Sequence, residues 1–180
     1  MLLLFVGHIR YQLDHMQDNS GLEKRISTAQ WILERNLAWI AAAEVKVGVV
    51  VSLNIAMLGG LSAAFGAAQQ KPAISIASTL IAAALSFTAL ICCALCVFPR
   101  VDGPVRSLLF FGRIAKEHRF DYVNALKTTT AEQILADWAE QIHRNADIAL
   151  IKHTWVKKAM FFSFFCTPSW ALSIYLLTKF

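Results

Sequence analysis

The chain has 180 residues, 57% of them hydrophobic, and a formal net charge of +5 at pH 7. About half of the hydrophobic residues lie in three stretches without a charged side chain. The remainder of the chain is too small for two independent soluble domains. The basic residues lie outside these stretches, most of them before the first or between the second and third, a distribution that favours membrane anchoring over nucleic-acid binding.

The N-terminal region, residues 1–45, is predicted to be helical and to lie outside the bilayer. Residues 1–6 are apolar but lack the basic start and the cleavage site of a secretory signal, so we expect them to pack against the protein or to dip into the membrane interface. Ser20 and Glu23 have the spacing of a capping box. Apolar residues at helical spacing follow, which predicts a helix from about Gly21 into the first span.

Residues 46–99 are predicted to form a transmembrane hairpin. Its two arms, 47–70 and 72–99, contain no charged residue. Each is longer than the roughly 20 apolar residues that cross a bilayer core as a helix. A single segment in lipid can satisfy its backbone hydrogen bonds only as a helix, so both arms are expected to be helical.

Small residues at helical spacing predict close packing in this hairpin. Gly59 and Gly60 each precede another small residue four positions later, Ala63 in the first case. The second span repeats the spacing at Ser78 and Ala82. Because small side chains let helix backbones approach closely, we expect the two small faces to meet in the resting subunit and to serve in assembly between subunits.

Three polar residues lie in or beside the first span. Asn54 is within it, where an unpaired polar group is costly, and it fits an interhelical hydrogen bond and a pore lining equally well. Glu44 and Lys46 stand at its entrance and are expected to meet partners from the following polar segment, such as Arg100 for Glu44. The candidate residues for membrane assembly or a pore are Glu44, Lys46, Asn54, Gly59, Gly60 and Ala63.

Residues 100–157 form the larger polar segment, which we interpret as a sensing segment. Residues 107–112 fit either a short extended piece or an interfacial helix. Thr130 and Gln133 form a second capping box, from which a long helix is predicted to run into a third span at residues 158–178. The expected fold is an all-α membrane protein with three transmembrane helices and a small helical cytoplasmic layer.

The basic residues predict the orientation of the spans. Of the 17 Lys and Arg, five precede the first span and ten lie between the second and third. Only Lys71 and Lys179 lie at the opposite ends of the spans. The positive-inside rule therefore predicts a cytoplasmic N-terminus and sensing segment, with the short turn and the C-terminus outside.

Nothing in the sequence predicts catalysis or a metal site. The four cysteines lie in the predicted spans, where cysteine behaves as a small apolar residue and no histidine accompanies it. None of the common catalytic or phosphate-binding motifs occurs. We therefore expect a protein that is not an enzyme and uses no metal or cofactor.

One feature of the sensing segment points to a ligand. Thr130 stands at a helix start, where free N–H groups favour an anion, in a segment rich in Arg and Lys. Tyr122, nearby in the chain, is suited to stacking on a base. Each of these residues also has an ordinary structural role, so the pattern indicates an anionic ligand without identifying it.

The order of these features resembles the Pycsar transmembrane effector family of bacterial antiphage defence, over about residues 35–178. Three positions depart from the family's pattern. Glu44-Val45 stands where Asp-Thr is usual, and Arg113 stands where Asp is usual, which reverses a charge. The resemblance rests on short segments in matching order: Ala43-Glu44-Val45-Lys46, Leu53-Asn54, Phe98-Pro99-Arg100, Phe110-Phe111-Gly112-Arg113-Ile114, Tyr122, Gln141-Ile142, Ile148 and Lys152.

The resemblance implies a receptor for a cyclic nucleotide second messenger, cUMP or cCMP, made by a companion cyclase upon phage infection. Binding would drive several subunits to assemble in the bacterial inner membrane and breach it, killing or arresting the infected cell. The implied partners are the nucleotide, membrane lipid and further copies of the chain, without nucleic acid. The alternatives are an effector gated by a cyclic oligonucleotide and a non-enzymatic membrane anchor for a partner protein.

A nucleotide phosphate is an anion, which Arg and Lys bind through charge-assisted hydrogen bonds. The candidate ligand residues are therefore the basic side chains of the sensing segment together with the residues suited to stacking and capping. They are Arg100, Arg113, Lys116, Tyr122, Thr130 and Lys152.

Overall fold

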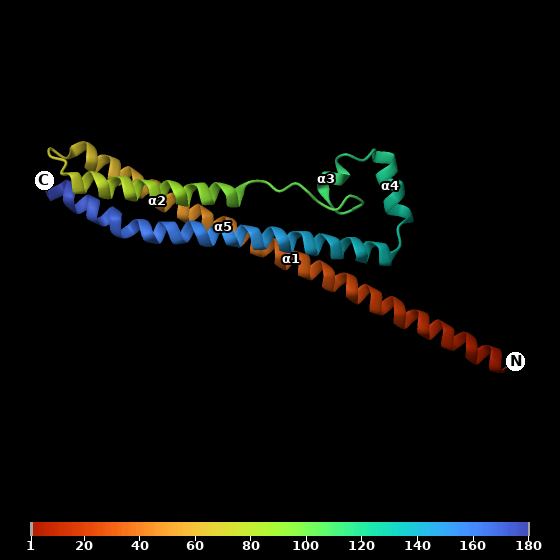
Figure 1. The fold of residues 1–180 in the computed structure, drawn as a ribbon. Helices are drawn as coiled ribbons and strands as arrows, with labels where there is room; N and C mark the ends of the chain where they lie inside the picture. The colour runs from red at the N-terminus through yellow and green to blue at the C-terminus, as the bar shows by residue number, and fades with distance from the viewer. Residues whose placement is uncertain (1, 180) are drawn as a thin grey trace. The chain divides into compact units, whose positions relative to one another are not determined.

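The computed structural model describes the backbone of residues 2–179 and the side chains of residues 20–179. These residues form five helices and no strand (Figure 1). The all-α fold is therefore confirmed. In chain order the helices are α1 (Leu2–Ala67), α2 (Ala73–Val97), α3 (Phe111–Ile114), α4 (Arg119–Thr128) and α5 (Ala131–Lys179).

The chain divides into two compact units. The polar unit comprises residues 1–38 and 101–147, and the membrane unit comprises residues 39–100 and 148–180. Helices α1 and α5 each contribute to both units. The polar unit thus contains α3, α4 and one end of each long helix, whereas α2 belongs entirely to the membrane unit.

Three helices, α1, α2 and α5, are long and apolar enough to cross a membrane, as expected. Many of their buried residues in the membrane unit are small or polar, with Ala82, Ala159 and Cys166 fully inaccessible. Large apolar side chains such as Leu80 and Phe164 are exposed instead, 65% and 71% respectively. This distribution suits lipid, because small residues allow close helix contacts while lipid chains solvate large apolar ones.

The two small faces of the hairpin do not meet, so that expectation was wrong. On α2, Ser78 and Ala82 are buried, and the Ala82 carbonyl accepts a hydrogen bond of 3.2 Å from the Cys166 thiol of α5. On α1, Gly59 and Gly60 are exposed, and no atom lies within 4 Å of a Cβ placed on Gly59. The larger side chains of α1 turn inward instead, and its small face remains on the surface.

The capping boxes gave one correct and one wrong prediction. The Thr130 N–H donates to the Gln133 side chain at 2.9 Å, and the Gln133 N–H donates back to the Thr130 hydroxyl at 3.3 Å, which begins α5. Helix α1 instead runs through Ser20 without interruption, so no helix begins near Gly21. The predicted packing of residues 1–6 lies outside the described side chains.

In the polar unit, a loop leads from α2 to the short helix α3. Residues 107–110 belong to this loop, with bends at residues 108 and 109, and helical structure begins only at Phe111. The stretch is therefore neither one extended piece nor one helix. The Ser107 hydroxyl accepts hydrogen bonds from the N–H groups of Leu109 and Phe110 at 3.0 and 2.9 Å. Gln141 of α5 donates to the same hydroxyl at 2.9 Å, which ties the loop to α5.

Candidate functional site

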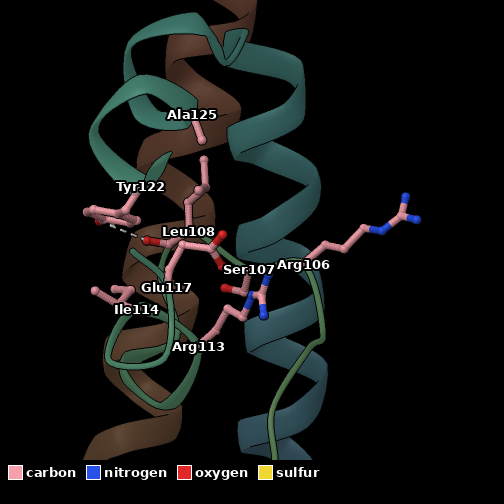
Figure 2. Close-up of a pocket in the computed structure, with 8 residues that line it drawn as sticks. All are labelled: Arg106, Ser107, Leu108, Arg113, Ile114, Glu117, Tyr122 and Ala125. Carbon is pink, nitrogen blue, oxygen red and sulfur yellow. Dashed lines mark hydrogen bonds and ion pairs between the residues drawn. The ribbon is translucent and has the colours of Figure 1, made fainter. Parts of the chain in front are cut away.

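The polar unit contains a cavity of about 190 Å³ beside the loop that precedes α3. Figure 2 shows that its lining comes from three segments: the loop, α3 with the turn that follows it, and α4. The lining residues are Arg106, Ser107, Leu108, Arg113, Ile114, Glu117, Tyr122 and Ala125.

Tyr122 of α4 is fixed in the wall of this cavity. Its hydroxyl donates a hydrogen bond of 3.1 Å to the carbonyl of Leu108 (Figure 2). The Leu108 N–H in turn donates to the carboxylate of Asp137 at 2.7 Å. One loop residue therefore joins α4 to α5, and the Tyr122 ring is held with its hydroxyl already engaged.

The charged groups of the cavity are Arg106, Arg113 and Glu117. Arg113 and Glu117 lie one helical turn apart and form an ion pair, with side chains 43% and 30% exposed. Figure 2 shows the Arg106 guanidinium directed away from the other labelled residues. An exposed pair one turn apart contributes only about 0.3–0.5 kcal/mol, so Arg113 can exchange its partner for another anion at little cost.

A second hollow of about 360 Å³ also uses Arg113, together with Lys116 and the loop from Val101 to Val105. Phe110 lies in its wall, against two glycines. A Cβ placed on Gly103 would lie 2.5 Å from the Phe110 ring, and one on Gly112 would lie 2.7 Å away. Both positions therefore require glycine for the Phe110 ring to keep this place.

Three of the predicted ligand residues, Arg113, Lys116 and Tyr122, line these two cavities. Thr130 lines neither and caps α5 instead. At the same helix start, hydrogen bonds from the Glu132 backbone N–H and from the Thr130 hydroxyl lower the pKa of the Glu132 carboxyl. The helix start that was predicted to favour an anion therefore already has one from the protein itself, the Glu132 carboxylate.

The remaining two predicted ligand residues, Arg100 and Lys152, belong to the membrane unit. Lys152 is buried, and its ammonium donates to the Glu44 carboxylate at 2.8 Å and to the Cys96 carbonyl at 3.0 Å. Glu44 thus meets a partner from the polar segment, as predicted, but that partner is Lys152 and not the suggested Arg100. Arg100 donates instead to the Leu95 carbonyl at 3.1 Å. The last carbonyls of a helix lack internal partners and carry partial negative charge, which accounts for both cations at the end of α2.

Asn54 is fully buried in the membrane unit. Its amide group donates to the Ser163 hydroxyl of α5 at 2.7 Å and to the Val50 carbonyl at 2.8 Å. The structure thus shows the interhelical hydrogen bond that the sequence suggested. The side-chain oxygen of Asn54 has no hydrogen-bond partner among the described residues.

Sequence reasoning missed the residues that support the candidate site. Asp137 and Gln141 lie one turn apart on α5 and hold neighbouring loop residues, Leu108 and Ser107. Their spacing, two polar residues four apart within an apolar pattern, was the available signal. Gln141 entered the sequence analysis only through the family resemblance, and Asp137 did not enter it.

Comparison with known proteins assigns the family. The sequence profile of the Pycsar effector protein domain matches residues 28–179. The Pycsar effector protein PtPycTM of Propioniciclava tarda is 28% identical over 134 residues, which cover 68% of this chain and 65% of that protein. The chain thus spans slightly less than two thirds of the length of this relative. No solved structure matches the chain. The profile match covers most of the chain, and the protein therefore belongs to the Pycsar effector family.

Proposed function

We propose that this protein is a membrane effector of antiphage defence that senses cUMP or cCMP and disrupts the bacterial inner membrane. Family membership supports the role in antiphage defence, and the three apolar helices support action at a membrane. The single observation that carries the sensing role is the position of Arg113. It lines both cavities of the polar unit and has only an exposed ion pair to hold it.

The larger hollow is the better place for a nucleotide. Ligand pockets usually measure about 300–1,000 Å³, a range that includes the hollow of about 360 Å³ but not the cavity of about 190 Å³. The cyclic phosphate would replace Glu117 as the partner of Arg113 and gain a second cation from Lys116. Tyr122, which lines the smaller cavity, would contact the nucleotide from the other side of Arg113.

Signal transfer would use the two long helices. Helices α1 and α5 pass from the polar unit into the membrane unit, so a change at their polar ends has a continuous path to the spans. Three spans cannot enclose an aqueous path, and leakage therefore requires several subunits. Ligand binding would have to favour the assembled state over the resting one, because a ligand shifts an equilibrium only through differential affinity.

A binding experiment tests the ligand. The purified full chain is titrated with cUMP and cCMP, with linear UMP and CMP as negative controls and a cyclic dinucleotide for the alternative effector class. We expect Arg113→Glu and Lys116→Glu to weaken binding at least tenfold. Lys127→Glu on α4, which lines neither cavity, is the matched control. Unchanged affinity in both cavity variants would move the site elsewhere, with Arg100, Lys152 and Lys157 as the next candidates.

An assembly experiment tests the membrane step. The exposed small face of α1, with Gly59, Gly60 and Ala63, is the proposed contact between subunits. Gly60→Leu or Ala63→Leu is expected to abolish ligand-triggered depolarisation of cells and to leave nucleotide binding intact. Ala77→Leu, an exposed position on α2, is the control. Normal depolarisation by the α1 variants would show that assembly uses another face.

We further propose that the N-terminus and the polar unit face the cytoplasm. Ten of the 17 Lys and Arg lie between the second and third spans, which supports this orientation through the positive-inside rule. Reporter fusions after Lys71 and at the C-terminus should read as periplasmic, and a fusion near Thr129 should read as cytoplasmic. A cytoplasmic C-terminus would contradict a third span.

A further inference from the structure

A groove of about 390 Å³ lies between α1 and α5 in the membrane unit, apart from both cavities of the polar unit. It has a polar and an apolar part. Lys46 of α1 and His153 and Lys157 of α5 line the polar part, whereas Met160, Phe161 and Phe164 line the apolar part. The groove therefore combines positive charge from two helices with a wall of apolar side chains.

Among the described residues the two lysines of this groove have no carboxylate partner, so the partner expected for Lys46 is not found there. No carboxylate of the described residues lies within salt-bridge distance of Lys46 or Lys157. Of the neighbouring lysines, Lys152 pairs with Glu44. Lys158 also lacks a carboxylate partner among the described residues, and its ammonium lies 4.3 Å from the centre of the Trp155 ring. The groove thus has one lysine from each of two helices in its lining and no carboxylate.

The position of the groove matches the border between headgroups and hydrocarbon. Lys46 is the last charge before the uncharged stretch 47–70, and Lys157 lies two residues before the uncharged stretch that begins at Ala159. From Lys157 to Phe164 a helix rises about 10 Å. Over that length the lining changes from ammonium groups to Phe161 and Phe164, which are 53% and 71% exposed.

We propose that this groove is a binding site for an anionic phospholipid. The lipid phosphate would lie against Lys46, Lys157 and His153, and an acyl chain would follow Phe161 and Phe164. Basic pockets between transmembrane helices on the cytoplasmic side are suited to such headgroups. A zwitterionic lipid would bring its own cation to the lysines, and a soluble anion would leave the apolar wall uncovered. The site is independent of the proposed nucleotide site.

Lipid retention by the purified full chain tests this proposal. The protein is incubated with mixed micelles of phosphatidylglycerol and phosphatidylcholine, and bound lipid is measured by native mass spectrometry. We expect at least tenfold preferential retention of phosphatidylglycerol by the wild-type chain. The double variant Lys46→Gln/Lys157→Gln should lose this preference, and Phe164→Ala should reduce retention several-fold. Inorganic phosphate at the same concentration should not displace the lipid.

Lys158→Gln is the matched control, because it removes the same charge one residue further along α5 but does not line the groove. It should retain the lipid as the wild-type chain does. Equal loss in the double variant and in Lys158→Gln would show general surface attraction and overturn the site. So would equal retention of the two lipids by the wild-type chain, a result that does not depend on how any variant folds. Displacement by inorganic phosphate would assign the groove to a soluble anion.

Discussion

Lys152 in the membrane unit and Arg113 in the polar unit are both basic side chains on helices, but their surroundings differ. The Lys152 ammonium is buried and held by a carboxylate and a backbone carbonyl from two other helices. The Arg113 guanidinium is 43% exposed and has a partner one turn away on the same short stretch of chain. Lys152 therefore joins three helices, whereas the ion pair of Arg113 joins only neighbouring turns of one short stretch, which is why Arg113 is the residue proposed to bind a ligand.

The largest effect is expected where a buried charge loses its partner. Glu44→Ala leaves the Lys152 ammonium buried with only the Cys96 carbonyl, and should lower the free energy of unfolding by about 3 kcal/mol. Lys152→Met should lower it less, because the abandoned Glu44 carboxylate is half exposed to solvent. Chemical unfolding in detergent measures both, with Lys158→Met as control. Equal small effects would mean that Lys152 does not hold the helices.

Substitution of a glycine in the polar unit should lower stability more than substitution of a glycine in the membrane unit. Gly112→Ala places a methyl group 2.7 Å from the Phe110 ring, and the forced shift should lower the free energy of unfolding by about 1–2 kcal/mol. It should also weaken nucleotide binding at the hollow that Phe110 lines. Gly59→Ala meets no atom within 4 Å and is the stability control. A neutral Gly112→Ala would mean that the ring moves freely.

Loss of the helix cap at the start of α5 should have an intermediate effect on the free energy of unfolding. Thr130→Ala removes the hydroxyl that accepts the Gln133 N–H, and should lower the free energy of unfolding by about 1 kcal/mol. Thr128→Ala is the control, because that hydroxyl bonds only within α4. If both threonine variants lose equal stability, capping is not the cause.

Thr130→Ala should also change the titration of Glu132. The pKa of Glu132 lies below its ordinary value because its backbone N–H and the Thr130 hydroxyl favour the carboxylate. This contribution to stability is present at neutral pH and is lost as the pH falls through the folded-state pKa. Thr130→Ala should raise the pKa of Glu132 towards its ordinary value, which a carboxyl NMR titration measures. An unchanged pKa would assign the shift to the backbone alone.

The smallest effect is expected at Arg113. Arg113→Gln removes an exposed ion pair within one turn and should change the free energy of unfolding by about 0.3–0.5 kcal/mol. The contrast with Glu44→Ala, measured under the same conditions, would quantify the difference between the two cations. If Arg113→Gln instead lowered the free energy of unfolding by 2 kcal/mol or more, Arg113 would have a structural role, which would contradict the comparison with Lys152.

Local features were predicted well because their causes are local. The uncharged stretches predicted the three long apolar helices, and the Thr130–Gln133 spacing predicted where α5 begins. The Ser20–Glu23 spacing failed because a capping box begins a helix only where the preceding residues are not already helical. A capping-box pattern thus predicts a helix start only where the residues before it are not helical.

The candidate site could be predicted only in part. A basic, aromatic-containing segment was evident from the sequence, and Arg113, Lys116 and Tyr122 do line cavities. Their grouping depends on Asp137 and Gln141, which lie about thirty residues further along the chain and hold the loop by hydrogen bonds. No spacing rule connects a loop to a helix at that distance, so the arrangement required the folded structure.

By itself the sequence determined the helical class and the three spans, because an uncharged stretch in lipid can satisfy its backbone groups only as a helix. Only the tertiary structure decided which face of α1 packs inward, with Asn54 buried and Gly59 exposed. It likewise decided that Glu44 meets Lys152, 108 residues away. Helices of similar composition can pack through several faces, and the choice among them follows from contacts that exist only once all three helices are together.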